Sequence, residues 1–367
     1  MRKRFDSSAF EKLTWAFGSP AHAENQIEHS GITLRSKAYI TAKIFRTGTG
    51  RRIRALRQRR GKLEVMAAKL HGALCEPTDF GRREFRAALV NVTNVCNLEC
   101  RHCFVYRAGN PNLARDKMDD ATMLHELRML RDKHGIKSML FMGGEPMIRK
   151  RLVFEAMKLF EHSSIVTNGT YGIPSIPNHL VTVSLDGPER MNDPIRGEGV
   201  FRKVKEAIFA RDPRDGTIVI IQMTITRENA PGLEEFIEEV KDWPVDGVAF
   251  TFHVPSKGEH GPLAWDDLRE RDAVIGRVIA LKRKNPTLLK SNVETLEMMK
   301  SERALDYTGE RGEHCALRSV LPLYMGDGGN FERTFCCYGN DVDCARCGAY
   351  GVFNSAYHRM KGDHAED

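Results

Sequence analysis

The chain contains nine cysteines, and their spacing is the feature most able to support chemistry. Three of them, Cys96, Cys100 and Cys103, form a C-x3-C-x2-C group, and five more fall within 33 residues near the C-terminus. Close groups of this kind are typical of metal ligands rather than of a disulfide framework. Three thiolates on one short loop suit an iron–sulfur cluster with one iron left open to a non-protein ligand.

A zinc site is the alternative for the first group, with His102 as the fourth ligand. Zinc sites usually arise from two pairs of the C-x2-C kind, so the spacing favours the iron–sulfur interpretation. The ninth cysteine, Cys75, stands apart from both groups. We expect it to be a small buried apolar residue.

A second motif follows about 40 residues after the cysteine group. The apolar run MLFM ends there in Gly143, Gly144, Glu145 and Pro146. Two glycines let the backbone approach a ligand closely, and a carboxylate can accept hydrogen bonds from an ammonium group. The motif therefore predicts a ligand contact.

The cysteine triplet, placed after the apolar run ALVNVTNV and before GGEP, resembles the signature of the radical S-adenosylmethionine (SAM) superfamily. The resemblance implies that the amino and carboxylate groups of SAM chelate the open iron of a [4Fe–4S] cluster. It also implies that GGEP lines the SAM amino group. His102 departs from the family pattern, which usually has an aromatic residue before the third cysteine.

Further cofactor contacts are implied by the resemblance at the ends of later strands, where the family binds the ribose, carboxylate and adenine of SAM. The corresponding residues are Thr167, Asn168, Ser184, Asp186, Thr224, His253 and Val254. From the residues alone, Asp186 is equally a simple turn residue and His253 equally a buried histidine with its own partner.

An alternation of strands and helices must position these residues. Apolar runs predict strands at 88–95, 137–142, 163–168, 179–186, 217–226 and 246–254. Apolar residues at spacings of three and four predict helices near 118–134, 150–162, 200–210, 231–242 and 266–284. Six such repeats predict an α/β fold with a parallel sheet and chemistry at the C-terminal strand ends. The resemblance implies a partial (β/α)6 barrel over 86–284.

After residue 284 the alternation is expected to end, and residues 285–367 contain the second cysteine group. A cysteine, a glycine-rich bend, a further cysteine and a C-x2-C pair can close four ligands around one metal centre, for which structural zinc is the alternative. In a radical SAM chain the arrangement resembles an auxiliary [4Fe–4S] module of the SPASM or twitch type. The predicted ligands are Cys315, Cys337, Cys344 and Cys347, with Cys336 as the alternative to Cys337.

Basic residues are concentrated at the N-terminus. Residues 1–90 hold 19 Lys and Arg against 8 Asp and Glu, and no acid lies between Glu28 and Glu64. This pattern predicts a basic arm over 1–85, either a solvated face or a helix that docks on an anionic surface. Interleaved apolar residues favour a membrane surface over nucleic acid.

The composition excludes several classes of protein. With 41% hydrophobic and 29% charged residues, most of the chain is expected to fold around a core. No apolar run approaches the roughly 18 residues of a spanning helix, and the basic start lacks a signal-peptide core. We expect a cytoplasmic protein with peripheral contact at the inner face of the membrane.

One branch of the family shares more of the sequence, over roughly residues 88–350. The segments Leu185–Gly187, Glu198–Val200, Val245–Gly247, Cys337–Tyr338 and Cys344–Cys347 resemble the adenosyl-hopene transferase-like group and its lipid-modifying relatives. Two departures are Phe335–Cys336 in place of a proline before Cys337, and the lack of a cysteine after Cys347.

The resemblance implies an enzyme that cleaves SAM reductively to a 5′-deoxyadenosyl radical, with flavodoxin or ferredoxin as electron donor. The radical would modify an unactivated carbon or a double bond of a lipid or isoprenoid. One alternative is a radical SAM maturase of a ribosomally made peptide. Another is a non-enzymatic metal protein that binds nucleic acid through its basic segment.

Overall fold

The structure is a computed structural model, and it describes residues 85–106, 116, 118–326 and 329–361. The expected basic arm, residues 1–85, lies outside these ranges apart from Phe85, and Cys75 lies outside them as well. Within the described ranges, no helix has the length and apolar character needed to cross a membrane.

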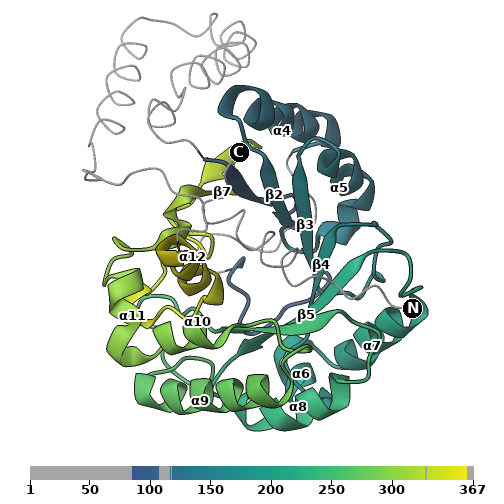
Figure 1. The fold of residues 1–367 in the computed structure, drawn as a ribbon. Coiled ribbons are helices and arrows are strands. Elements are labelled where there is room, and N and C mark those ends of the chain that lie inside the picture. Colours follow the sequence, from purple (N-terminus) through teal and green to yellow (C-terminus); the bar gives the residue numbers. More distant parts are fainter. Residues whose placement is uncertain (1–84, 107–115, 117, 327–328, 362–367) are drawn as a thin grey trace, which may run out of the picture. The chain divides into compact units, whose positions relative to one another are not determined.

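One eight-stranded sheet organises the described chain, in the order β6-β5-β4-β3-β2-β1-β7-β8 (Figure 1). Neighbouring strands from β6 to β7 are parallel, and β8 is antiparallel to β7. The strands are β1 Ala87–Asn91, β2 Ser138–Met142, β3 His162–Thr167, β4 Leu180–Ser184, β5 Ile218–Ile225, β6 Gly247–Phe252, β7 Val320–Met325 and β8 Phe331–Arg333. The six predicted strands and their parallel arrangement are confirmed.

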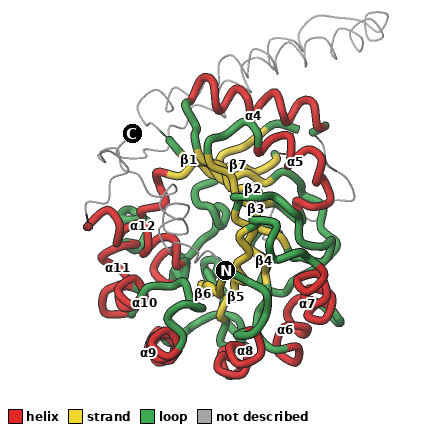
Figure 2. The backbone as a smooth tube through the Cα atoms, turned by 45° about the vertical axis from the view of Figure 1, so that its right-hand side comes forward, coloured by secondary structure: helices red, strands yellow, loops and turns green. Residues whose placement is uncertain are grey.

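Helices lie on the outer side of the curved sheet (Figure 2). They are α4 Asp120–His134, α5 Lys150–Met157, α6 Glu189–Arg196, α7 Val200–Ala210, α8 Leu233–Val240, α9 Leu268–Lys284, α10 Val293–Met298, α11 Ser301–Thr308 and α12 Tyr350–Lys361, with short 3-10 turns η2 Pro146–Arg149, η3 Ala230–Gly232, η4 Ala316–Ser319 and η5 Cys344–Arg346. Helix α8 illustrates their pattern, since its buried residues Leu233, Phe236, Ile237 and Val240 recur at spacings of three and four.

The regular alternation of strand and helix ends near residue 284 as expected, but the sheet does not end there. Strand β7 pairs with β1 in parallel, so the sheet continues past that boundary. Helix α12 contacts both β6 and η4, and it packs between the β6 and β7 sides of the sheet. The run VLPLYM did not indicate a strand because Pro322 interrupts it, and helix α6 was missed because it is short and contains Pro194.

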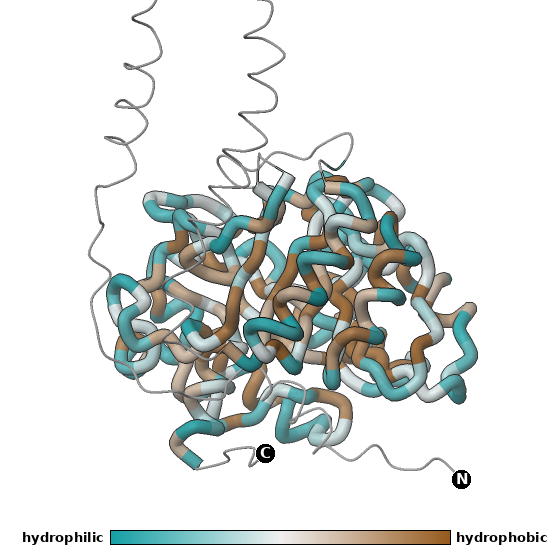
Figure 3. The backbone as a smooth tube through the Cα atoms, turned by 90° about the horizontal axis from the view of Figure 1, so that it is seen from above, coloured by the Kyte–Doolittle hydropathy of each residue, from teal (hydrophilic) through white to brown (hydrophobic). Residues whose placement is uncertain are grey.

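The main hydrophobic core lies between the sheet and the outer helices. Val183, Ile221 and Phe250 from the strands pack with apolar residues of α7, α8 and α9 in one fully buried cluster. Figure 3 shows hydrophobic stretches within the molecule and hydrophilic ones around its rim. This packing holds the strand ends in place, and the loops after them carry the residues expected to do chemistry.

Candidate active site

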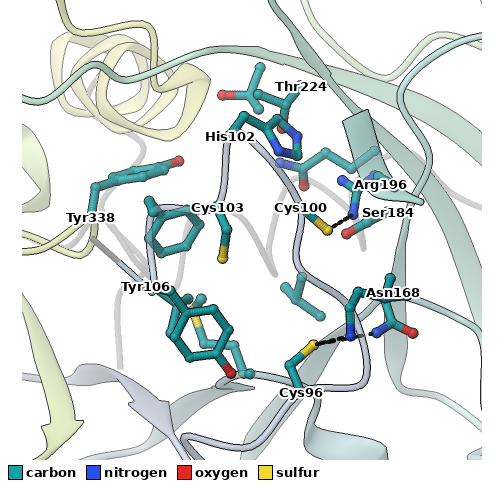
Figure 4. A pocket seen from close by; sticks show the side chains of 18 of the residues that line it. Cys96, Cys100, His102, Cys103, Tyr106, Asn168, Ser184, Arg196, Thr224 and Tyr338 are labelled. Carbon is teal, nitrogen blue, oxygen red and sulfur yellow. Dashed lines mark hydrogen bonds between the residues drawn. The ribbon is translucent and has the colours of Figure 1, made fainter. Parts of the chain in front are cut away.

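A cleft at the C-terminal ends of β1 to β6 gathers most of the residues that the sequence predicted (Figure 4). It holds about 970 Å³ of empty space, part of it open to solvent. The predicted residues that line it are Cys96, Cys100, Cys103, Gly143, Gly144, Thr167, Asn168, Ser184, Thr224, His253 and Val254. Glu145, Pro146 and Asp186 are not among the residues that line it, and their predicted contacts with the cofactor stay predictions.

The three cysteines lie on the loop after β1, and their side chains surround one open space. The Sγ atom of Cys96 lies 3.4 Å from the backbone nitrogen of Leu98 and 3.8 Å from Nδ2 of Asn168. Nη1 of Arg196 lies 4.0 Å from Sγ of Cys100. Burial raises the pKa of Cys96 and of Cys100 to about 11, so both are protonated thiols at neutral pH without a metal.

The two glycines of the GGEP motif are required by the protein's own backbone. A Cβ atom at Gly144 would lie 2.0 Å from the hydroxyl of Tyr106 and 2.3 Å from the carbonyl oxygen of Val95. A Cβ atom at Gly143 would lie 2.6 Å from the carbonyl oxygen of Thr93. The close approach predicted from the glycines is therefore one between the β2 loop and the start of the cysteine loop.

Backbone hydrogen bonds join the same two loops. The N–H of Gly144 donates to the carbonyl of Thr93 at 2.8 Å, and the N–H of Glu145 donates to the carbonyl of Val95 at 2.9 Å. The GGEP loop thus fixes the backbone that leads directly into Cys96.

The carboxylate of Glu145 is fully buried and hydrogen-bonded to the protein. Oε1 accepts from the backbone N–H of Met147 at 2.9 Å and the hydroxyl of Thr167 at 2.7 Å, and Oε2 accepts from the N–H of Asn168 at 2.7 Å. Burial raises the pKa of Glu145 although these three donors oppose the shift. Glu145 holds the end of β3 against the end of β2, and so positions Thr167 and Asn168 in the cleft.

Asp186 holds an arginine and a histidine in a similar way. Its side chain is fully buried, and Oδ2 lies 2.6 Å from Nε of Arg196 and 2.8 Å from Nε2 of His102. Oδ1 accepts from the N–H of Thr224 at 2.8 Å. Burial alone would raise the pKa of Asp186, but Arg196 and His102 hold it well below its usual range.

His102 and Arg196 both line the cleft, and Asp186 orients both of them. The contact with Asp186 gives Nε2 of His102 a partner other than a zinc ion. Arg196 was missed because it ends the unpredicted helix α6. The sequence signal that could have found it is the basic residue in PIRG, which is Arg196 itself and follows the LDG turn.

The remaining predicted contacts lie at the ends of the later strands. His253 and Val254 directly follow β6 and line the cleft, and Nε2 of His253 lies 2.6 Å from Oε1 of Glu259. This pairing agrees with the interpretation of His253 as a buried histidine with its own partner. The cleft also includes residues that sequence reasoning missed, namely Tyr106, Gln222, Thr251 and Tyr338.

The C-terminal cysteines separate into two environments. Cys315, Cys336 and Cys344 pack against the core cluster that contains Cys347, whereas Cys337 belongs to a different cluster beside Leu89 and Val105. Burial, together with the smaller effects of the neighbouring Cys315 and Cys344, raises the pKa of Cys336 to about 12. The structure thus groups Cys336, rather than the predicted Cys337, with the other three.

A buried arginine holds the loop that carries the C-x2-C pair. Arg271 is fully buried, and its guanidinium donates to the backbone carbonyls of Cys347 at 3.0 Å and Met299 at 3.0 Å. The N–H of Phe252 donates to the carbonyl of Gly348 at 2.8 Å. These bonds tie the second cysteine group to the end of β6, next to the cleft.

The geometry of the thiols bears on the choice of metal. Among the described residues, no three His, Cys, Asp or Glu side chains are placed to hold one metal ion. A zinc ion needs its sulfur ligands about 2.3 Å away, which brings them close together. An iron–sulfur cluster takes its thiolates on separate iron atoms and accepts a wider spacing. The wider spacing that a cluster accepts is the reason that a cluster is proposed below for both cysteine groups.

Comparison with known proteins agrees with this geometry. Residues 90–240 match the family model of the radical SAM superfamily. An uncharacterized protein of Archaeoglobus fulgidus is 28% identical over 42% of this chain and 38% of its own length. Pre-heme d1 synthase of Dinoroseobacter shibae is 28% identical over 42% of this chain and 40% of its own length. Sporulation killing factor maturation protein SkfB of Bacillus subtilis is 27% identical over 41% of this chain and 38% of its own length. The chain thus spans about two fifths of these relatives.

Solved structures share the fold. One is anSMEcpe with bound AdoMet, at a TM-score of 0.51 and 16% identity, covering 76% of this chain and 84% of that one. Another is Streptococcus suis SuiB bound to S-adenosylmethionine, at a TM-score of 0.51 and 14% identity, covering 82% of this chain and 72% of that one. Residues 90–240, which carry the cysteine triplet and GGEP, thus match the radical SAM superfamily.

Proposed function

We propose that the chain cleaves SAM reductively in the cleft and modifies an unactivated carbon or a double bond of its substrate. The observation that carries the proposal is the arrangement of three cysteine side chains around one open space, with polar residues of four neighbouring strand ends, those of β3 to β6, lining it. When bound at Cys96, Cys100 and Cys103, a [4Fe–4S] cluster supplies the electron for this cleavage.

The protein's own residues hold and orient SAM in this proposal. The cationic guanidinium of Arg196, fixed by Asp186, suits the carboxylate of SAM and stands beside Cys100. The polar side chains of Thr167 and Asn168, fixed by Glu145, are placed for further contacts in the cleft. Ser184, Thr224, His253 and Val254 are proposed to contact the ribose and adenine.

The test is an anaerobic reaction of the full chain reconstituted with iron and sulfide. With dithionite and SAM, we expect methionine and 5′-deoxyadenosine by mass spectrometry, and about eight irons per chain as two cubane clusters require. Tight zinc binding without iron, or iron loading without any SAM cleavage, would contradict the proposal.

A second [4Fe–4S] cluster is proposed at Cys315, Cys336, Cys344 and Cys347. We expect Cys336→Ala to lower the iron content toward about four per chain and to change the electron paramagnetic resonance spectrum. The neighbouring Cys337→Ala is the matched control, and it should retain about eight irons because Cys337 packs among apolar residues. The opposite result would return Cys337 to the ligand set.

Two substrate classes belong to the proposal. A lipid or isoprenoid substrate, with peripheral membrane contact through the basic arm, rests on the resemblance to the adenosyl-hopene transferase-like group. A peptide substrate has support from SkfB, whose name describes a maturation protein. A flavodoxin or ferredoxin as reductant and a cytoplasmic location complete the proposal.

A further inference from the structure

A second cavity lies inside the barrel next to the cleft, on its strand side, and holds about 1280 Å³ of empty space, part of it open to solvent. We call it the inner chamber. It is lined by inward residues of β1 to β7, by residues 350, 351, 354 and 355 of α12, and by residues 104, 317, 337 and 338. We propose that the inner chamber binds an extended hydrocarbon chain, as the apolar part of the substrate. The inference rests on the proposed function, because it takes the cleft as the place of reaction.

Small side chains leave this space open. Barrels of parallel strands are normally filled by layers of bulky branched residues. Here Ser164 on β3, Thr182 on β4 and Ala249 on β6 face the interior, and Gly351 faces it from α12. Ala249 is only half-buried although helices cover its strand, because its exposed surface borders the chamber.

The apolar residues of the chamber wall do not meet across it. Leu89 on β1 and Val320 on β7 belong to one buried cluster, whereas Leu180 on β4 and Ile220 on β5 belong to another. Each side of the barrel thus packs with itself and leaves an apolar surface facing the chamber. Filling this space would add the dispersion contacts that both sides now lack.

The chamber wall offers little to a polar ligand. None of the described residues that line it is charged or a histidine. The amide oxygen of Asn354 is already engaged, since Nδ2 of Asn292 lies 3.2 Å away and the hydroxyl of Tyr350 also 3.2 Å away. A peptide backbone placed here would lose its hydration without enough partners, whereas a hydrocarbon chain gains free energy on leaving water.

The chamber and the cleft share a boundary. Met142, Val166 and Thr251 line both cavities, while Leu140, Ser164 and Ala249, two residues earlier on the same strands, line only the chamber. Residues two apart on a strand lie on the same face, about 6.6 Å apart. The chamber is therefore the layer directly beneath the cleft. A chain bound there would bring its adjoining carbons to the cysteine loop.

Two aromatic rings mark this boundary. Phe104, next to Cys103, and Tyr338, next to Cys337, have ring centroids 4.7 Å apart and line both cavities. Their faces and edges suit contact with methylene groups. A hydrocarbon chain that passes them connects the chamber to the site of reaction.

The test uses the full chain without cofactors and a series of n-alkanols from hexanol to decanol that displace cis-parinaric acid. We expect affinity to rise about fourfold for each added methylene, the equivalent of about 0.8 kcal/mol. We also expect Ala249→Phe to weaken decanol binding at least tenfold by filling the chamber. The matched control is Ala210→Phe, at an exposed position at the end of α7, which should bind decanol like the wild type.

The inference is overturned if the affinity of the wild type for n-alkanols does not depend on their chain length. This measurement does not require any variant to fold. It is also overturned if acetyl-tetraleucine amide displaces the dye as well as decanol does, since an apolar peptide would then be the occupant. If the protein cleaves SAM but does not bind the alkanols, only the proposed role of the chamber is contradicted. If it binds the alkanols but does not cleave SAM, only the proposed function is contradicted.

Discussion

Replacing Cys96, Cys100 and Cys103 together by alanine is expected to abolish SAM cleavage and to lower the iron content from about eight to about four per chain. The three side chains face one cleft, and no other described cysteine lines it. A cluster there would lose every protein ligand at once. Iron and sulfide analysis, with product detection by mass spectrometry, measures both effects.

The reciprocal variant replaces Cys315, Cys344 and Cys347 together by alanine. It should also lose about four irons. The four irons that remain should give the electron paramagnetic resonance spectrum of the cluster at Cys96, Cys100 and Cys103, which the first variant lacks. Full iron content in the first variant, or SAM cleavage above background, would remove the cysteine loop from the active site. Thermal unfolding of both metal-free variants checks that the fold is retained.

Asp186→Asn is expected to reduce the free energy of unfolding by about 3–5 kcal/mol, because it leaves the buried charge of Arg196 without its anionic partner. Arg196 is itself buried, at 8% side-chain exposure, so water cannot replace the lost carboxylate. Denaturant unfolding of the metal-free chain measures the change. SAM affinity of the reconstituted variant should fall as well, since Arg196 loses its orientation in the cleft.

The pH dependence of this variant follows from the lowered pKa of Asp186. The folded pKa lies below the unfolded value of about 3.9, so ionised Asp186 stabilises the fold at every pH above about 4. That stabilisation is lost as the pH falls through the folded pKa. The difference between wild type and variant should be present at neutral pH and shrink below pH 4.

Asp132→Asn is the matched control, because Asp132 forms an exposed ion pair with Arg131 on α4. Exposed pairs are screened by water, and the unfolding curve should not move. Equal stability of the two variants would show that Asp186 does not hold a charged partner. A partial recovery in the double variant Asp186→Leu with Arg196→Met is also expected, since it removes both buried charges.

Much of the barrel could be predicted because its signals are local. Each of the six strands is a short apolar run, and helices such as α7 carry their buried residues at regular spacing. Parallel strands joined by helices place their C-terminal ends at one edge. The order of the motifs along the chain therefore already placed Cys96, Gly143, Thr167 and Thr224 near one another.

The local signals failed where proline interrupts an element. Strand β7 contains Pro322 and gains its place from pairing with β1, more than 200 residues earlier in the chain. Helix α6 contains Pro194, and its last residue, Arg196, contacts Asp186. Pairing of this kind depends on contacts between distant segments, which periodicity does not record.

The sequence by itself determined which residue types are available for chemistry and which strand end each of them follows. Only the tertiary structure decided which way the side chains face. It buried Glu145 and Asp186 against residues that line the cleft, and it grouped Cys336 instead of Cys337 with the last cysteines. The physical reason is that burial and partners, which depend on packing between distant segments, select the orientation of each polar side chain.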